Sequence, residues 1–405
     1  MLKYFDYIVV ISMFIGISIA VDYLGWPTME QNKAWGSALP VSYVLLIFLV
    51  LRIDKFLKSK GFNFIFFLIT FLLISVYRYV IGDGTGLFKI LSVLITPLMA
   101  MFWAFDMKER GNSGSVKKLF LLLFFISLLI AIYEKFAHTL LFPYSNFNHY
   151  DLNGTIHGEY VRSNSVWGHP LTNAFTVSVI MIFIYWSDLR SVYKWTLYMG
   201  GFVSLLCFGG RGAFFISILF GFLSLLLPTG KKIKIADIVK RVIFFVFSVL
   251  ILYYLVSYTT LSDRLLGLKT DSSDYSTNER IEAFQYLMNI DSSALFRGIG
   301  QNDYLLTHNH IENWILMFVM TFGVIITAYI VFYYIYICLY SLNGYSKFKK
   351  ICLFGVFISI SLTNNSLAIA SPAFPIYFLC CAIFFNANTN PNNSQRYHVI
   401  SRKLK

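Results

Sequence analysis

Residues 119–139 read LFLLLFFISLLIAIYEKFAHT, and no charged side chain interrupts them before Glu134. An α-helix rises about 1.5 Å per residue, so about 20 apolar residues span the hydrocarbon core of a bilayer. This stretch therefore predicts a transmembrane helix, and similar runs recur along the chain. They lie near residues 6–24, 37–52, 62–80, 87–106, 119–139, 170–187, 193–208, 212–228, 242–258, 311–339, 351–366 and 370–387.

The composition of the whole chain supports the same interpretation. Its 405 residues are 57% hydrophobic and 13% charged, whereas roughly 25% of the residues in an average soluble domain are charged. So few charges do not cover a water-facing surface, which excludes an ordinary soluble protein. We predict an all-α, polytopic integral membrane protein of about twelve transmembrane helices. Its weakest boundary is Asn364–Ser366, either an outer turn or a polar break inside one long helix.

The predicted topology accounts for the net charge of +13. With the N-terminus in the cytoplasm, 23 of the 33 Lys and Arg residues fall on the cytoplasmic side. The positive-inside rule then places both termini in the cytoplasm and explains the basic balance without nucleic acid. Six of the seven histidines fall on the outer side, where we expect any chemistry. The five cysteines lie in apolar runs without zinc-site or disulfide spacing, so no metal and no disulfide is expected.

The predicted spans divide the chain into six parts. Residues 1–141 hold helices one to five, 142–170 form a first long outer loop, 171–258 hold helices six to nine, 259–310 form a large outer loop, 311–387 hold the C-terminal helices, and 388–405 form a basic cytoplasmic tail. Long connections are usually functional, so the two outer loops are expected to carry the site. The second loop is predicted to contain an amphipathic helix at Asn278–Met288 on the membrane surface.

Arg211 stands in the sequence Phe208-Gly209-Gly210-Arg211-Gly212, a minimal turn between two apolar runs on the predicted outer side. Glycines let backbone or ligand approach closely, and a partly desolvated guanidinium suits a bidentate contact with phosphate. An arginine that reaches outward to the lipid headgroups is the alternative. Most basic residues of the chain fall on the predicted cytoplasmic side, whereas Arg211 falls on the outer side. This exception favours a functional role for Arg211.

A second candidate segment leads from the first long loop into a helix. It is Arg162–Pro170, with the sequence RSNSVWGHP. Its Asn and Ser side chains supply hydrogen bonds, and the ring of Trp167, with His169 close by in the sequence, offers a face on which a sugar stacks. The segment therefore suits a sugar or headgroup site. A solvated loop that ends in an interfacial tryptophan is the alternative.

The second long loop carries three further polar motifs. They are NERIEAF at 278–284 with Arg280, FRGIG at 296–300 with Arg297, and THNHIENW at 307–314 with His308, Asn309 and His310. A neutral imidazole at an aqueous edge can take a proton from a hydroxyl, so the last motif offers a candidate general base. Two histidines at i and i+2 make a poor metal site, and an interfacial histidine is the other alternative.

The order of these motifs resembles the bacterial O-antigen polymerase and O-antigen ligase superfamily. The resemblance rests on the arginine segment at 162–170, Gly-Arg-Gly at 210–212, the late-loop motifs and then Phe322-Gly323. It covers residues 160–330 in motif and the whole chain in topology. It implies a GT-C-like membrane glycosyltransferase at the outer face of the bacterial cytoplasmic membrane. The implied donor is a polyprenyl-diphosphate-linked sugar, with no nucleotide, metal or other cofactor.

The resemblance also implies roles for single residues. Arg211 and Arg280 are expected to hold the diphosphate and, with His308 as the base that activates the acceptor hydroxyl, to form the catalytic set. The expected substrate-binding residues are Arg162, Arg297, His169, Trp167, Asn309 and His310. Breaking a sugar–diphosphate bond builds negative charge on the leaving group, and fixed guanidinium groups stabilise that charge.

The first hypothesis is therefore a polymerase that joins lipid-linked oligosaccharide repeat units, as donor and acceptor, into O-antigen, capsule or exopolysaccharide. A ligase that hands glycan to a lipid or other acceptor is second, because Gly323 follows His308 later than in ligase-like members. A flippase would carry polar residues through its helix interiors, whereas here they gather at one face. A scaffolding protein explains the helices but not the outward Arg and His. The resemblance leaves room for a chain-length regulator and a flippase as partners.

Overall fold

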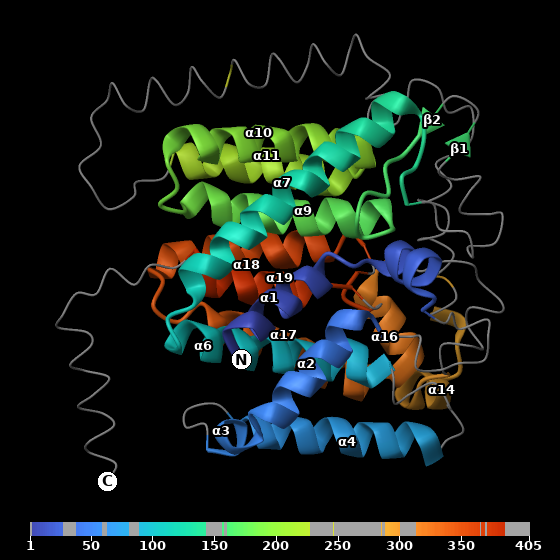
Figure 1. Cartoon of the computed structure of the whole chain (residues 1–405). Coiled ribbons are helices and arrows are strands. Elements are labelled where there is room, and N and C mark those ends of the chain that lie inside the picture. Colours follow the sequence, from blue (N-terminus) through green and yellow to red (C-terminus); the bar gives the residue numbers. More distant parts are fainter. Residues whose placement is uncertain are drawn as a thin grey trace.

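A computed structural model describes residues 2–26, 38–58, 63–80, 89–142, 156–157, 160–226, 246, 285, 288–299, 313–364, 366–368 and 371–384. This part of the chain is helical almost throughout, which confirms the predicted all-α class (Figure 1). The elements are α1 (Leu2–Met13), η1 (Ile19–Tyr23), α2 (Pro40–Leu51), α3 (Ile53–Leu57), α4 (Phe64–Val80), η4 (Leu91–Ile95), α6 (Thr96–Glu109), α7 (Ser113–Ala137), β1 (Ile156–His157), β2 (Tyr160–Val161), α9 (Pro170–Trp186), α10 (Ser191–Phe208), α11 (Arg211–Leu226), α14 (Ser292–Arg297), α16 (Trp314–Phe322), α17 (Val324–Ser341), α18 (Lys347–Ser361) and α19 (Ala373–Ile383). The strands β1 and β2 form one two-residue antiparallel pair.

The helices lie where the apolar runs predict them. Each predicted span contains helix, except 242–258, of which only residue 246 is described. Within the described part of the chain, three helical stretches are long and apolar enough to cross a membrane, namely Leu91–Glu109, Ser113–Ala137 and Val324–Ser341. That twelve helices cross a membrane stays a prediction. Asn364 lies in a turn between α18 and α19, so these are two helices and not one.

One predicted helix, residues 6–24, is broken near its middle. The helix α1 ends at Met13, and the backbone N–H of Gly16 donates to the carbonyl oxygen of Val166 at 3.0 Å. A Cβ atom on Gly16 would collide with the same carbonyl group and with the backbone of Trp167. The break therefore exists because a distant loop packs directly on the backbone, and the expectation of one continuous helix is wrong.

The predicted helix at 311–339 is also broken, at Gly323. This residue has φ +81°, and a Cβ atom there would collide with the carbonyl group of Phe296. Only glycine readily adopts this backbone conformation, so α16 ends and α17 begins at Gly323. The segment with Phe296 thus packs against a break between two helices, where the sequence alone predicts one continuous helix.

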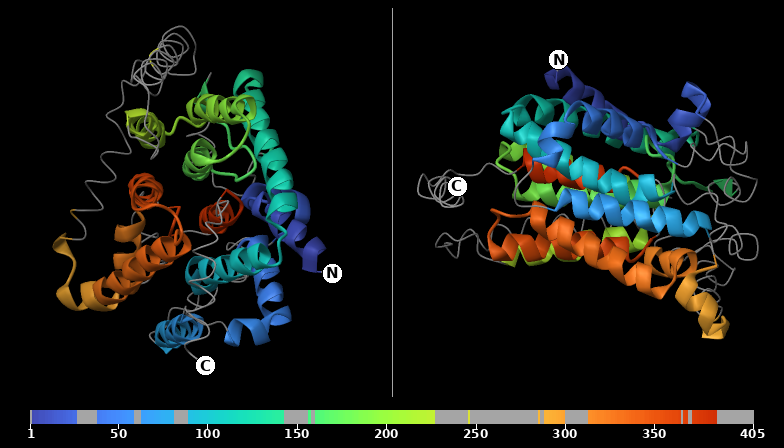
Figure 2. Two further views of the ribbon diagram at one scale, coloured as in Figure 1. Left: turned by 90° about the vertical axis from the view of Figure 1, so that its left-hand side faces the viewer. Right: turned by 90° about the horizontal axis from the view of Figure 1, so that it is seen from below.

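The helices α9 and α19 lie in the middle of the bundle. The helix α9 contacts α10, α11, α18 and α19, while α19 also contacts α6, α7 and α17. In the left view of Figure 2 many helices are seen close to end-on around α9 and α19. On the outside, α4 and α7 expose large apolar side chains such as Phe66, Leu73, Leu122 and Leu129. Exposed apolar faces of this kind suit a lipid environment.

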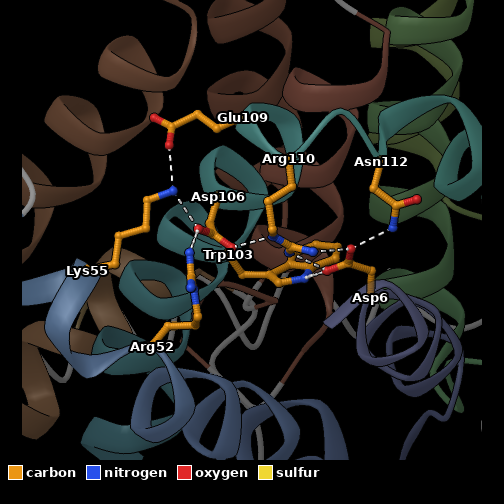
Figure 3. Close-up of polar contacts among 8 residues, drawn as sticks. All are labelled: Asp6, Arg52, Lys55, Trp103, Asp106, Glu109, Arg110 and Asn112. Carbon is orange, nitrogen blue, oxygen red and sulfur yellow. Dashed lines mark hydrogen bonds and ion pairs between the residues drawn. The ribbon is translucent and has the colours of Figure 1, made fainter. Parts of the chain in front are cut away.

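A cluster of charged side chains joins α1, α2, α3 and α6 at one end of the bundle (Figure 3). Arg110 bridges two buried carboxylates, with Nη2 2.7 Å from Asp6 Oδ1 and Nε 2.6 Å from Asp106 Oδ2. Arg52 and Lys55 also bind Asp106, at 2.7 and 2.6 Å. Buried charges require such partners. This cluster draws together the N-terminus and two loops predicted on the cytoplasmic side, whereas β1, β2 and α14 lie at the other end (Figure 1).

Candidate functional site

Two of the predicted motifs meet at the end that carries β2. Arg162 directly follows β2, and its Nε donates to the carbonyl oxygen of Phe208 at 3.0 Å. The backbone N–H of Ser163 donates to the carbonyl oxygen of Cys207 at 3.2 Å. These bonds use the last carbonyl groups of α10, which have no partner within the helix, and a cation there is favourable. The segment with Arg162 therefore lies against the turn that leads to Arg211.

Arg211 begins α11 after a sharp turn. Gly209 has φ +64° and ends α10 in the left-handed conformation that glycine adopts without steric cost. A Cβ atom on Gly210 would lie 2.7 Å from Cβ of Ala174 in α9, and one on Gly212 would lie 2.9 Å from Cγ2 of Thr363. The turn between α10 and α11 is therefore as short as predicted, and its glycines admit close packing of α9 and of the segment after α18.

Glu134 holds the loop that carries Arg162. Its side chain, from α7, is completely buried, and Oε2 accepts from the hydroxyl of Ser163 at 2.5 Å. The same oxygen accepts the backbone N–H groups of Asn164 and Ser165 at 2.9 and 2.8 Å, and Oε1 accepts that of Leu141 at 2.9 Å. Four donors on one carboxylate compensate the burial of its charge. Glu134 is thus the anchor of this loop.

Ser165 and Asn173 make further hydrogen bonds that hold this loop in place. Ser165 has φ +40°, and its hydroxyl donates to the carbonyl oxygen of Ser127 at 2.8 Å. Nδ2 of Asn173, in α9, donates to the carbonyl oxygens of Asn164 and His169 at 2.6 and 2.8 Å. Within the described part of the chain, Oδ1 of Asn164 and Oδ1 of Asn173 are buried without a hydrogen-bond partner. Buried polar atoms of this kind mark a place for water or a polar ligand.

Asn313, at the start of α16, lies close to the same place. Its Oδ1 accepts the backbone N–H groups of Ile315 and Leu316, which caps α16. Its Nδ2 donates to the carbonyl oxygen of Leu362 at 3.3 Å, next to the Thr363 that packs on Gly212. Asn313, which follows His310 by three residues in the sequence, therefore lies near the Gly-Arg-Gly turn.

Arg297 lies apart from this group. The backbone N–H of Ile299 donates to the carbonyl oxygen of Met320 at 2.9 Å, so the Arg297 segment packs at the far end of α16 from Asn313. Nη1 of the buried Arg78 donates to the carbonyl oxygen of Arg297 at 3.4 Å. At about 1.5 Å per residue, the length of α16 separates Arg297 from Asn313 by roughly 14 Å. The structure therefore does not bring Arg297 together with Asn313.

His169 and Trp167 have structural contacts of their own. Nδ1 of His169 accepts the backbone N–H of Leu171 at 3.3 Å and caps α9. Trp167 is 2% exposed, its Nε1 donates to the carbonyl oxygen of Met13 at 2.9 Å, and its ring centroid lies 5.4 Å from that of Phe14. A sugar-binding role for either residue stays a prediction, because their observed contacts are with the protein itself.

Four predicted site residues lie outside the described residues, namely Arg280, His308, Asn309 and His310. Sequence reasoning did not single out Glu134, whose only signal is a carboxylate close to the end of an apolar helix. Of the ionisable groups in the described ranges, no set of three His, Cys, Asp or Glu side chains stands close enough to hold a metal ion.

The arrangement suits an anionic ligand. A guanidinium presents N–H donors in a planar fork that matches phosphate oxygens. Arg162 is 8% exposed, so its charge acts in a partly desolvated place. Arg211 stands at the first residue of α11, where backbone N–H groups and the helix dipole also favour an anion.

No family model, no curated protein and no solved structure matches the chain.

Proposed function

We propose that the chain is a membrane glycosyltransferase that polymerises polyprenyl-diphosphate-linked oligosaccharide repeat units into surface polysaccharide. One observation carries the proposal. The loop before α9 and the Gly-Arg-Gly turn, far apart in the sequence, are joined by the bond from Arg162 to the Phe208 carbonyl oxygen. Two arginine motifs and a helix N-terminus at one place supply the positive groups that a diphosphate needs.

The proposed reaction transfers a glycan between two lipid-linked molecules. The acceptor hydroxyl oxygen attacks the anomeric carbon of the donor, and the bond between that carbon and the diphosphate oxygen breaks. His308 takes the hydroxyl proton, and polyprenyl diphosphate leaves with the electron pair. Arg211 and Arg280, with Arg162, stabilise the charge that grows on the diphosphate. The roles of His308 and Arg280 are those that the family resemblance implies.

The proposal includes an orientation in the membrane. The chain crosses the bacterial cytoplasmic membrane about twelve times with both termini in the cytoplasm, and the site faces outward. A lipid-linked donor then reaches the site sideways from the outer leaflet. The grouping of Asp6, Arg52 and Arg110 at the opposite end of the bundle supports this orientation, since Asp6 and Arg52 lie at the predicted cytoplasmic ends of their spans and Arg110 lies in a loop predicted to be cytoplasmic.

Polysaccharide chain length in cells tests the proposal. A strain that lacks the native gene is complemented with wild type, Arg211→Gln, His308→Ala or Lys118→Gln, and surface polysaccharide is separated by gel. We expect a full ladder from wild type and from the exposed control Lys118→Gln, and single repeat units from the other two. Full ladders from Arg211→Gln and His308→Ala at normal protein abundance would refute the site.

Purified protein in detergent separates the transferase from a flippase. Detergent removes the two sides of the membrane, so only a transferase lengthens the glycan of a lipid-linked repeat unit there. Transfer to a lipid-core acceptor, without elongation of the lipid-linked chain, would identify a ligase. Binding of the repeat unit with no change in glycan mass would favour the flippase.

A further inference from the structure

Lysine side chains from three helices gather at the end opposite the candidate site. They are Lys117 of α7, Lys194 of α10 and Lys349 of α18, here called the lysine cluster. The ammonium of Lys194 experiences the charges of Lys117, Lys349 and Asp188, and that of Lys117 also experiences Asp188. The turn from α9 to α10 and the start of α18 lie on the left of Figure 1, whereas β2 and α14 lie on the right.

This arrangement is electrostatically unfavourable by itself. The half-buried Lys117 and Lys349 each repel the half-buried Lys194, and the exposed Asp188 supplies one negative charge. Each lysine also lies in the first two turns of its helix, since α7 begins at Ser113, α10 at Ser191 and α18 at Lys347. The N-terminus of a helix has partial positive charge, which disfavours a cation there. A bound anion would relieve both sources of repulsion.

Two lysines of the lysine cluster lie against aromatic rings. Nζ of Lys349 lies 5.2 Å from the centroid of the Trp186 ring, and Nζ of Lys117 lies 5.2 Å from that of Phe384. The indole N–H of Trp186 is buried, and no described residue accepts its hydrogen bond. A donor on a ring that contacts one ammonium group of the cluster, next to apolar side chains, suits a phosphate that carries acyl chains.

We propose that the lysine cluster and the Trp186 indole bind the phosphate of an anionic phospholipid. The sequence predicts these helix ends at the cytoplasmic leaflet, where anionic lipids concentrate. The ammonium groups contact the phosphate, the Trp186 N–H donates to one of its oxygens, and the acyl chains lie along the bundle. This site is separate from the proposed glycosyltransferase site; it rests on the proposed orientation in the membrane and not on the proposed reaction.

Lipid binding to the purified protein tests the proposal. Thermal unfolding and native mass spectrometry are measured in detergent with phosphatidylglycerol, with phosphatidylcholine, and with inorganic phosphate at the same concentration. We expect phosphatidylglycerol to bind and to raise the melting temperature by several degrees, and the other two to do neither. The variant Lys117→Gln/Lys194→Gln/Lys349→Gln should bind phosphatidylglycerol at least tenfold more weakly.

A matched control keeps the net charge equal. Lys118→Gln/Arg190→Gln/Lys347→Gln removes three exposed charges near the same helix ends, and it should bind phosphatidylglycerol as wild type does. Equal loss in both triple variants would overturn the proposal, because the attraction would then be general. Stabilisation by inorganic phosphate equal to that by lipid would also overturn it, in favour of a soluble anion.

A second variant covers the case in which the triple variant does not fold. Trp186→Phe keeps the ring beside Lys349 and removes the N–H donor. It should fold, keep its melting temperature without lipid, and bind phosphatidylglycerol several-fold more weakly. Unchanged binding in Trp186→Phe would exclude the indole from the site.

Discussion

Arg162 and Phe208 are 46 residues apart in the sequence and are joined by a hydrogen bond of 3.0 Å from Nε to the carbonyl oxygen. The bond occupies a carbonyl group at the end of α10 and fixes the guanidinium beside the turn to Arg211. Behind it, Glu134 holds three consecutive loop residues, Ser163–Ser165. The position of Arg162 therefore depends on a carboxylate in another helix.

Replacing Glu134 tests this dependence. Glu134→Gln replaces one carboxylate oxygen with an NH2 group that faces backbone donors. An unsatisfied buried donor costs about 1–3 kcal/mol, so we expect a lower melting temperature and slower glycan elongation. Both are measured on purified protein. Glu109→Gln, whose side chain is 66% exposed, serves as control; it should lose at most about 1 kcal/mol from its exposed pair with Lys55 and should elongate glycan as wild type does. Wild-type stability and elongation in Glu134→Gln would contradict the anchoring role.

The glycine at the break between α16 and α17 makes a second test. Gly323→Ala places a Cβ against the carbonyl group of Phe296 and at φ +81°. A non-glycine residue in that conformation costs about 1–3 kcal/mol, so the unfolding midpoint should fall. Gly355→Ala is the matched control, because nothing lies within 4 Å of its Cβ position inside α18. Equal effects of the two substitutions would argue against the tight contact.

Arg110 tests the charged cluster of Figure 3. Arg110→Met removes the cation that bridges Asp6 and Asp106, while Arg52 and Lys55 remain on Asp106. Breaking a buried ion pair costs about 3–5 kcal/mol, and the remaining cations favour the lower end of that range. Chemical unfolding in detergent measures the loss. A loss below about 1 kcal/mol, typical of exposed pairs, would show that the cluster is solvated.

Because of Lys55, the stability that this cluster contributes should depend on pH in the alkaline range. Burial lowers the pKa of Lys55, but its hydrogen bonds to Asp106 and Glu109 raise the pKa by more. A raised folded-state pKa contributes stability that is complete below the unfolded value of about 10.4 and is lost as pH rises through the folded value. Lys55 is 36% exposed, so at most about 1 kcal/mol is expected.

The measurement compares melting temperatures at pH 9 and pH 11. Wild type should lose more stability over this interval than Lys55→Met. The exposed Lys58→Met serves as control and should follow wild type. Identical losses of stability in Lys55→Met and wild type would show that Lys55 is not the source of the pH dependence.

The sequence predicted the helices well because their signal is local. Apolar runs of the right length locate α4, α7, α9 and α10, and the short Gly-Arg-Gly turn follows from its own residues. The positions of the breaks were missed. Gly16 and Gly323 interrupt helices because Val166 and Phe296 pack on their backbones, and contacts at such sequence distances leave no periodic trace.

The candidate site was predicted only in part for the same reason. The chemistry of Arg162 and Arg211 can be read from their types and flanking residues, but their joint position depends on how α7, α9 and α10 pack. Glu134 resembles any carboxylate near the end of a helix until its partners are known. The packed ring of Trp167 could not be distinguished from an exposed one, since both occur beside a membrane entry.

A double-mutant cycle on glycan elongation tests the central claim that Arg162 and Arg211 act on one diphosphate. Elongation rates with purified lipid-linked repeat units are measured for wild type, Arg162→Gln, Arg211→Gln and the double variant. Each single change should slow elongation about 10- to 100-fold, as expected for loss of a charge-assisted hydrogen bond of about 1.5–3 kcal/mol. The double variant should be far less impaired than the product of the two effects. Wild-type rates in either single variant, or effects that simply multiply, would contradict the claim.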